Sequence, residues 1–253
     1  MIAHLALDQI LFIDIETVSE HPDLTMVPEP LQDLWQQKGG RFARYAGQEW
    51  TPEVAAETYE QKAAIFAEFG RVVVISAGFL YRSEGGWAMK IKSFARDDER
   101  ALLHEFAQLL DQHYSDPSQH YLCGHNIREF DIPFLCRRMI IKGLALPDII
   151  NVTGKKPWET AHFLDTMTFW KFGDIKHYTS LSLLATILGV PTPKDDIDGS
   201  DVGRVYWEEN DLARIVQYCE KDVATVAQVL LRLQGMEMIP SQRIASVASQ
   251  ETT

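Results

Sequence analysis

The chain has 253 residues, of which 46% are apolar and 24% are charged, as is usual for a globular protein. Its formal net charge of −12 disfavours extended, non-specific binding to duplex nucleic acid, and no apolar run approaches the roughly 20 residues of a membrane span. The N-terminal segment lacks the basic region of a signal peptide, and the three cysteines form no CxxC pair. We therefore expect a cytoplasmic protein without membrane attachment, disulfide framework or zinc site.

The first strand is predicted over residues 9 to 17 and contains the run LFIDIET. Asp14 and Glu16 interrupt its apolar residues, and because alternate side chains of a strand share a face, both carboxylates point the same way. An edge-strand charge pair is one interpretation. On a central strand, however, a cation has to offset the repulsion and desolvation of the two groups. Mg²⁺ or Mn²⁺ does so with oxygen ligands alone.

A long connection separates the first strand from the second. Residues 19 to 30 are rich in Pro and Glu and are typical of a loop, whereas residues 31 to 69 predict two helices joined by a turn. The helix after Pro52 ends at Gly70, which follows the usual preference for proline at a helix start and glycine at its end. Long insertions of this kind often cover an active site or bind a partner.

The remaining elements alternate between strands and helices. The run RVVVISAGFLY predicts a buried strand, RSEGG a hairpin turn, and WAMKIKSFA the next strand. An amphipathic helix over 97 to 114 precedes a short strand at YLCGHN, a helix with Pro133 in its first turn, and a strand or strand-to-helix segment at HFLDTMTFW. A helix ending at Gly189 and one long helix follow. This order predicts a single α/β domain over 1–238 around a mixed sheet, with a mobile polar tail over 239–253.

Further acidic residues lie in apolar surroundings. Asp131 precedes Pro133 by two residues, Asp165 lies in FLDTM, and Tyr218 and Asp222 share one face of the long helix. Taken singly, each has a structural explanation: a helix cap, a hydrogen-bonded buried carboxylate, or a solvated helix face. Together with Asp14 and Glu16 of the first strand, they provide carboxylates from several separate elements that could form one metal site. Two-metal displacement at phosphorus requires such groups to converge.

Three segments resemble the exonuclease motifs of the DEDD 3′–5′ exonuclease superfamily, in the same order: FIDIET, GHNIREFDIPFL and YCEKDV. The tyrosine four residues before the last aspartate is typical of the DEDDy branch. Within it, the chain is most similar to stand-alone predicted 3′–5′ exonucleases related to the exonuclease domain of family B DNA polymerases. The resemblance spans about residues 9 to 232. It implies an RNase H-like fold, a mixed five-stranded sheet flanked by helices. The helical insertion at about 19–69, predicted above from its own residues, is not part of the resemblance.

The resemblance also implies a role for each motif residue. The residues implied to bind two Mg²⁺ or Mn²⁺ ions are Asp14, Glu16, Asp131 and Asp222. Tyr218 would position the attacking water. The residues implied to bind the terminal nucleotides are Thr17, Asn126 and Phe130. Asp165 would not bind a metal itself but would help to hold the metal-binding residues in place.

Together these implications predict a metal-dependent 3′–5′ exonuclease. It would hydrolyse phosphodiester bonds at 3′ ends of single-stranded nucleic acid, DNA rather than RNA, by a two-metal-ion mechanism that releases nucleoside 5′-monophosphates. Two alternatives stay open: a nucleic-acid end-binding accessory module with reduced catalysis, and a phosphohydrolase of small nucleotides. The presence of all four carboxylates and the tyrosine argues against a loss of catalysis.

Overall fold

A mixed sheet of six strands forms the centre of the protein, in the order β5-β4-β1-β2-β3-β6. The computed structural model describes residues 5–47, 49–174, 178–191 and 196–247. The strands are β1 (Ile10–Ser19), β2 (Gly70–Ser83), β3 (Gly86–Ala95), β4 (Tyr121–Gly124), β5 (Phe163–Asp165) and β6 (Ile244–Val247). Strands β1, β2 and β3 form an antiparallel meander, while β4, β5 and β6 each pair in parallel with a neighbour. The α/β class is as predicted, but the sheet has six strands in place of five.

The additional strand comes from the segment predicted to be a mobile tail. Within 239–253, Ser241–Arg243 form a 3₁₀ turn and β6 pairs with residues 89–92 of β3. Polar contacts hold this segment: the Arg243 guanidinium donates to the carbonyl of Gly85, and Ser246 Oγ donates to Glu220 Oε1 at 2.8 Å. The strand has only four residues, and of these only Ile244 packs against the core while the other three are exposed, so its sequence lacks the repeated apolar pattern that predicts a strand. Residues 248–253 lie outside the described part of the chain.

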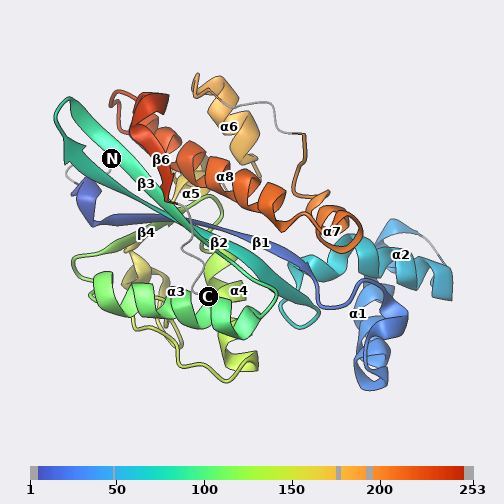
Figure 1. Cartoon of the computed structure of the whole chain (residues 1–253). Coiled ribbons are helices and arrows are strands. Elements are labelled where there is room, and N and C mark those ends of the chain that lie inside the picture. Colours follow the sequence, from blue (N-terminus) through green and yellow to red (C-terminus); the bar gives the residue numbers. More distant parts are fainter. Residues whose placement is uncertain (1–4, 48, 175–177, 192–195, 248–253) are drawn as a thin grey trace.

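Helices cover both faces of the sheet (Figure 1). One face packs against α3 (Glu99–His113) and α4 (Asp131–Ile141), and the other against α8 (Leu212–Leu233), beside which α6 (Leu181–Ile187) lies. The shorter helices are α5 (Thr166–Lys171), α7 (Val202–Arg204) and a π-helical turn, Val205–Glu209. None of the helices in the described ranges is both long and apolar enough to cross a membrane.

Strand β1 divides its side chains between the two cores. Ile13 and Ile15 belong to the cluster with α3 and α4, whereas Phe12 belongs to the cluster with α8. Helix α8 also lies close over β2, because a Cβ atom on Gly78 would come within 2.9 Å of Val223 Cγ1. The alternation directs Asp14, two residues after Phe12, toward α8.

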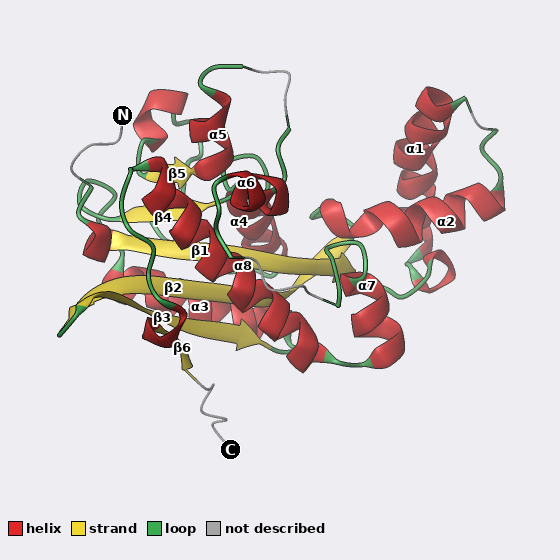
Figure 2. Cartoon of the chain, turned by 90° about the horizontal axis from the view of Figure 1, so that it is seen from above, coloured by secondary structure: helices red, strands yellow, loops and turns green. Residues whose placement is uncertain are grey.

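The long connection between β1 and β2 forms a helical insertion, as predicted. Its helices α1 (Glu29–Ala46) and α2 (Pro52–Lys62) stand beyond the end of β1 (Figure 2). They enclose a separate small core in which the Trp35 ring meets the edges of Tyr59 and Phe69, with centroids 5.3 and 5.0 Å away. The insertion thus has its own packing and does not depend on the sheet for its core.

One arginine ties both ends of the insertion to the body. Arg138 of α4 is 2% exposed; its Nε donates to Glu99 Oε1 at 2.8 Å and its Nη1 to the carbonyl of Ala67 at 2.9 Å. Its Nη2 also pairs with the carboxylate of Glu20. Since Glu20 begins the insertion and Ala67 lies near its end, the root of the insertion is fixed relative to α4.

Candidate active site

Four of the predicted site residues come together from three elements. Asp14 and Glu16 lie on β1, Asp131 is the first residue of α4, and Asp222 lies on α8. Burial raises the pKa of Asp14 well above its ordinary value, and the charges of the other three carboxylates raise it further. Burial, Asp222 and Asp131 raise the pKa of Glu16 in the same way. Acidic groups that are far apart in the sequence therefore repel one another in one place.

Asp131 reaches the cluster because β4 is short. Strand β4 pairs with β1 only at residues 10–12, so the edge of β1 beyond Phe12 is open on that side. The carboxylate of Asp131, 3% exposed, occupies this edge and accepts a hydrogen bond from the backbone N–H of Ile15. Burial and the nearby Asp165 raise the pKa of Asp131 to about 7, despite the N–H groups of Asp131 and Ile15 that favour its charged form.

A β-bulge follows directly after the two carboxylate residues of β1, between Glu16 and Thr17. Glu16 lies opposite Val74 and Thr17 opposite Val72, so Val73 of β2 is the extra residue. Bulges bend a strand locally and change the direction of the side chains beside them. Asp14 and Glu16 lie before the bulge and follow the regular alternation of β1, whereas Thr17 lies after it. The Thr17 side chain is half-buried. Its role in substrate binding stays a prediction.

Helix α8 supplies three neighbouring site residues. The Tyr218 hydroxyl forms a hydrogen bond with Asp222; burial, together with the charges of Asp222, Glu16 and Asp14, raises the tyrosine pKa well above its ordinary value. Cys219 Sγ lies 3.4 Å from both the carbonyl oxygen and Oδ2 of Asp14. Burial and the charges of Asp14 and Glu16 also raise the pKa of Cys219, so the thiol stays protonated and donates.

Sequence reasoning missed Cys219 as a site residue. The ligand atoms of Asp14, Glu16 and Cys219 all lie within 4.8 Å of one another. One signal was available: Cys219 is three residues before Asp222 and so lies on its side of the helix. The apolar character of a buried cysteine makes a core position the ordinary interpretation, and only the packing of α8 on β1 brings its thiol to Asp14.

The donor set fits divalent cations that prefer oxygen ligands. Burial raises the pKa values of Asp14, Glu16 and Asp131, and the charges of neighbouring carboxylates raise them further. A cation would offset this repulsion, and carboxylate oxygens are the ligands that Mg²⁺ and Mn²⁺ prefer. Asp14, Glu16, Asp131 and Asp222 would hold such ions, with the Cys219 thiol as the one softer group beside them.

Asp165 holds the loop before α4. Its buried carboxylate, 1% exposed, accepts hydrogen bonds from the N–H groups of Asn126 at 3.0 Å, Arg128 at 3.5 Å and Met167 at 3.0 Å. It therefore caps α5 and fastens the turn at Asn126, whose φ of 65° is unusual for a residue other than glycine. Asn126 Oδ1 is buried and has no hydrogen-bond partner among the described residues. A buried acceptor without a protein partner can accept a hydrogen bond from a water or a ligand.

Phe130 has a mixed environment. Its ring is half-buried against Phe134 of α4, with centroids 5.5 Å apart, at the margin of the core under α3 and α4. Part of the ring is available to a substrate, but much of its surface packs against the protein. Contact with nucleotides stays a prediction for this residue.

A pocket of about 610 Å³ opens onto the cluster. Its wall includes Asp14, Tyr218 and Asp222, together with His125 and Tyr178. The His125 ring lies between two elements, with Nδ1 2.9 Å from Thr166 Oγ1 and Nε2 2.8 Å from the carbonyl oxygen of Thr179. Two of the four carboxylates, Asp14 and Asp222, therefore face a space large enough for a small molecule or one nucleotide.

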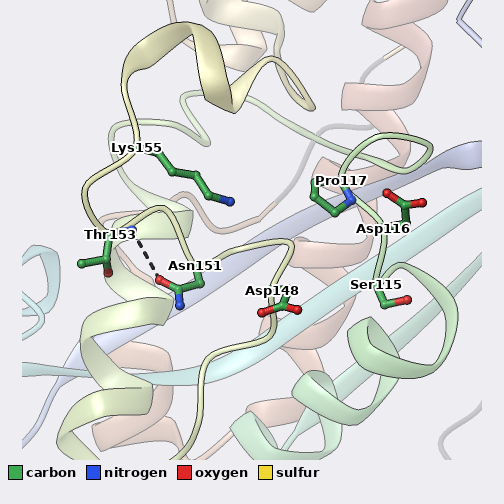
Figure 3. Close-up of a pocket in the computed structure, with 7 residues that line it drawn as sticks. All are labelled: Ser115, Asp116, Pro117, Asp148, Asn151, Thr153 and Lys155. Atoms are coloured by element: carbon green, nitrogen blue, oxygen red, sulfur yellow. Dashed lines mark hydrogen bonds between the residues drawn. The ribbon is translucent and has the colours of Figure 1, made fainter.

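A second pocket, of about 590 Å³, lies between the loops at 115–117 and 148–155 (Figure 3). It contains Asp116, Asp148 and Lys155, and the Asn151 side chain in its wall accepts from the N–H of Thr153 at 3.3 Å. None of the predicted site residues lines it. The site geometry thus points to the first pocket.

Comparison with known proteins places the chain in a family. The model of the family described as predicted 3′–5′ exonucleases related to the exonuclease domain of PolB matches residues 65–248. The chain belongs to this family. The region matched to the PolB-related exonuclease family contains Asp131, Tyr218 and Asp222 and begins after Asp14 and Glu16. No curated protein matches the chain.

The fold of the chain resembles part of a family B DNA polymerase from the hyperthermophilic archaeon Pyrobaculum calidifontis. The TM-score is 0.53 at 14% sequence identity, and the match covers 88% of this chain. The chain spans only 24% of the length of that polymerase. At this identity the likeness shows a shared fold.

Proposed function

We propose that the chain is a 3′–5′ exonuclease that hydrolyses phosphodiester bonds at 3′ ends of single-stranded nucleic acid, DNA in preference to RNA. The observation that carries this proposal is the convergence of Asp14, Glu16, Asp131 and Asp222 beside Tyr218, at a pocket open to substrate. Membership in a family of predicted 3′–5′ exonucleases supports it. The antiparallel β1–β2–β3 meander continued by parallel β4 and β5 is consistent with an RNase H-like fold.

The proposed cofactors are two Mg²⁺ or Mn²⁺ ions held by the four carboxylates. When bound, such ions supply Lewis acidity toward the phosphate and lower the pKa of a bound water. The protein's part is to present rigid ligands: two from a strand, one from a helix start and one from a helix face. Nucleoside 5′-monophosphates would be the products.

Several side chains would assist without binding a metal. The Tyr218 hydroxyl is held beside Asp222 and stays protonated, so it can orient a water by hydrogen bonding without titrating. The Cys219 thiol fixes Asp14, and Asp165 fixes the turn that carries Asn126. Asn126, Thr17 and Phe130 would contact the terminal nucleotides.

A 5′-labelled thymidine oligonucleotide incubated with Mg²⁺ or Mn²⁺ tests the proposal. We expect a descending ladder of products, release of thymidine 5′-monophosphate, and complete loss of both with EDTA. An RNA oligonucleotide of matching length reports the sugar preference. Binding without shortening would instead indicate an end-binding accessory module. Hydrolysis of free nucleotides alone would indicate a small-nucleotide phosphohydrolase.

A further inference from the structure

Tyr178 is an exposed aromatic residue in the wall of the active-site pocket. Its side chain is 71% exposed, yet it lines the same pocket as Asp14 and Asp222. A tyrosine this exposed contributes little to the core, because most of its apolar surface stays in water. Its position beside the carboxylates is therefore not explained by packing.

The backbone on the C-terminal side of this ring is anchored. The carbonyl oxygen of Thr179, a buried residue, accepts a hydrogen bond from His125 Nε2 at 2.8 Å. The next residue, Ser180, caps α6 by accepting from the N–H of Leu183 at 3.3 Å. A fixed backbone presenting a free aromatic ring is the arrangement expected of a preorganised binding group.

The rest of the pocket wall suits a nucleotide. Ser180 and Ser182 bring hydroxyl groups, and Lys221, one residue before Asp222, brings a cationic group that suits a phosphate. The volume of about 610 Å³ lies in the range of small-molecule sites and leaves room for one nucleotide unit but not for a base pair with its stacked neighbours. Aromatic side chains beside a backbone-binding groove are the usual platforms for unpaired bases.

We infer that Tyr178 stacks on a base at the 3′ end of the strand, and so positions the terminal nucleotide against the carboxylate cluster. This inference rests on the proposed function of the same site and adds a means of selecting unpaired ends. A paired terminal base has its faces covered by its neighbours and has to unstack before Tyr178 can take it. The contact is tolerant of base identity, because every base offers a flat face.

The test compares two oligonucleotides that differ only in their last residue, thymidine or a tetrahydrofuran abasic residue with a free 3′ hydroxyl. The measured quantity is the ratio of kcat/KM for the two ends. We expect wild type and Tyr178→Phe to prefer the thymidine end by about 10-fold, as one base stack provides, and Tyr178→Ala and Tyr178→Leu to bring the ratio near one. The control is Tyr45→Ala, because Tyr45 is a 92% exposed tyrosine on α1 outside the pocket wall, and this variant should keep the wild-type ratio.

A wild-type ratio in both Tyr178→Ala and Tyr178→Leu, or no preference in wild type, would overturn the inference. A failure of the proposed function is distinguishable. If wild type shortens neither oligonucleotide, the same comparison is made by fluorescence anisotropy with Ca²⁺ in place of Mg²⁺. A preference for the thymidine end that depends on the Tyr178 ring then still supports stacking, and equal binding of both ends by all variants refutes it.

Discussion

The thiol of Cys219 lies 3.4 Å from Asp14 Oδ2 and also 3.4 Å from the carbonyl oxygen of the same residue. Helix α8 thus contacts both the backbone and the side chain of the first carboxylate on β1. Because Tyr218 and Asp222 belong to the same helix, this contact helps to set their position relative to Asp14 and Glu16 on β1.

Replacing Cys219 should therefore weaken metal binding. Cys219→Ala removes a hydrogen bond worth about 1 kcal/mol, so we expect the Mg²⁺ concentration for half-maximal cleavage to rise about fivefold. The matched control is Cys136→Ala on α4, which removes a thiol that donates to the carbonyl of Ile150 at 3.3 Å, away from the carboxylates. The measurement is the rate of oligonucleotide cleavage as a function of Mg²⁺ concentration. If Cys219→Ala needs the same Mg²⁺ concentration as wild type for half-maximal cleavage, the thiol does not orient Asp14.

Neutralising a carboxylate of the cluster should lower the activity without lowering the stability of the metal-free protein. We expect Asp14→Asn and Asp222→Asn each to lower kcat by roughly 1,000-fold or more, because a ligand charge is lost. The melting temperature without metal should stay the same or rise, since repulsion inside the cluster is relieved. Asp111→Asn, at an exposed position on α3, should change neither quantity. Near-normal turnover in either site variant would remove that residue from the proposed metal centre.

The Tyr218 hydroxyl should affect turnover rather than metal affinity. Tyr218→Phe deletes the group beside Asp222, and we expect kcat to fall by about 100-fold with an unchanged Mg²⁺ requirement. Since burial and the carboxylates raise the tyrosine pKa, the rate of the wild type should show no break near pH 10 from this group. Tyr206→Phe serves as the control, because the Tyr206 hydroxyl donates to Asp97 at 2.9 Å outside the cluster. Equal losses in both variants would indicate a general structural effect.

The metal-free protein should lose stability as the pH rises. A carboxyl whose pKa is raised in the folded state binds its proton more tightly there than in the unfolded chain. For Asp131 this stabilisation is fully present below the unfolded pKa of 3.8 and is lost as the pH rises through the folded pKa of about 7. The raised pKa values of Asp14 and Glu16 act in the same direction.

The clearest window for this measurement begins at about pH 6.5. Burial lowers the pKa of His125 and His162, so these residues add stability as the pH rises, but that gain is complete near their unfolded value of 6.5. Between pH 6.5 and 8 the free energy of unfolding in EDTA, measured with urea, should therefore fall. Mn²⁺ should raise it more at pH 8 than at pH 6.5. If the free energy of unfolding in EDTA stays constant or rises between pH 6.5 and 8, the carboxylates of the cluster do not have raised pKa values.

Local patterns in the sequence were sufficient to predict much of the site. Alternation along β1 places Asp14 and Glu16 on one side, proline spacing places Asp131 at the start of α4, and the four-residue interval places Tyr218 and Asp222 together on α8. Each of these relations lies within one element or at its boundary. The convergence of the elements followed only from the resemblance to known exonucleases.

Contacts between distant elements could not be predicted in this way. The Cys219 thiol meets Asp14 only because α8 lies close over the sheet. The buried pair of Arg138 and Glu99 joins α4 to α3, 39 residues apart, and the apolar periodicity of a helix does not indicate which charged residues will pair. These features depend on tertiary packing, which a linear pattern does not encode.

Strand β6 also has a consequence for solubility. If it were removed, residues 89–92 of β3 would present unpaired N–H and C=O groups along the outer margin of a ten-residue strand, a template on which another chain can add. The opposite margin is β5, whose three residues are too few to recruit a neighbour effectively. The four residues Ile244–Val247 thus cover an edge of β3 on which another chain could otherwise pair.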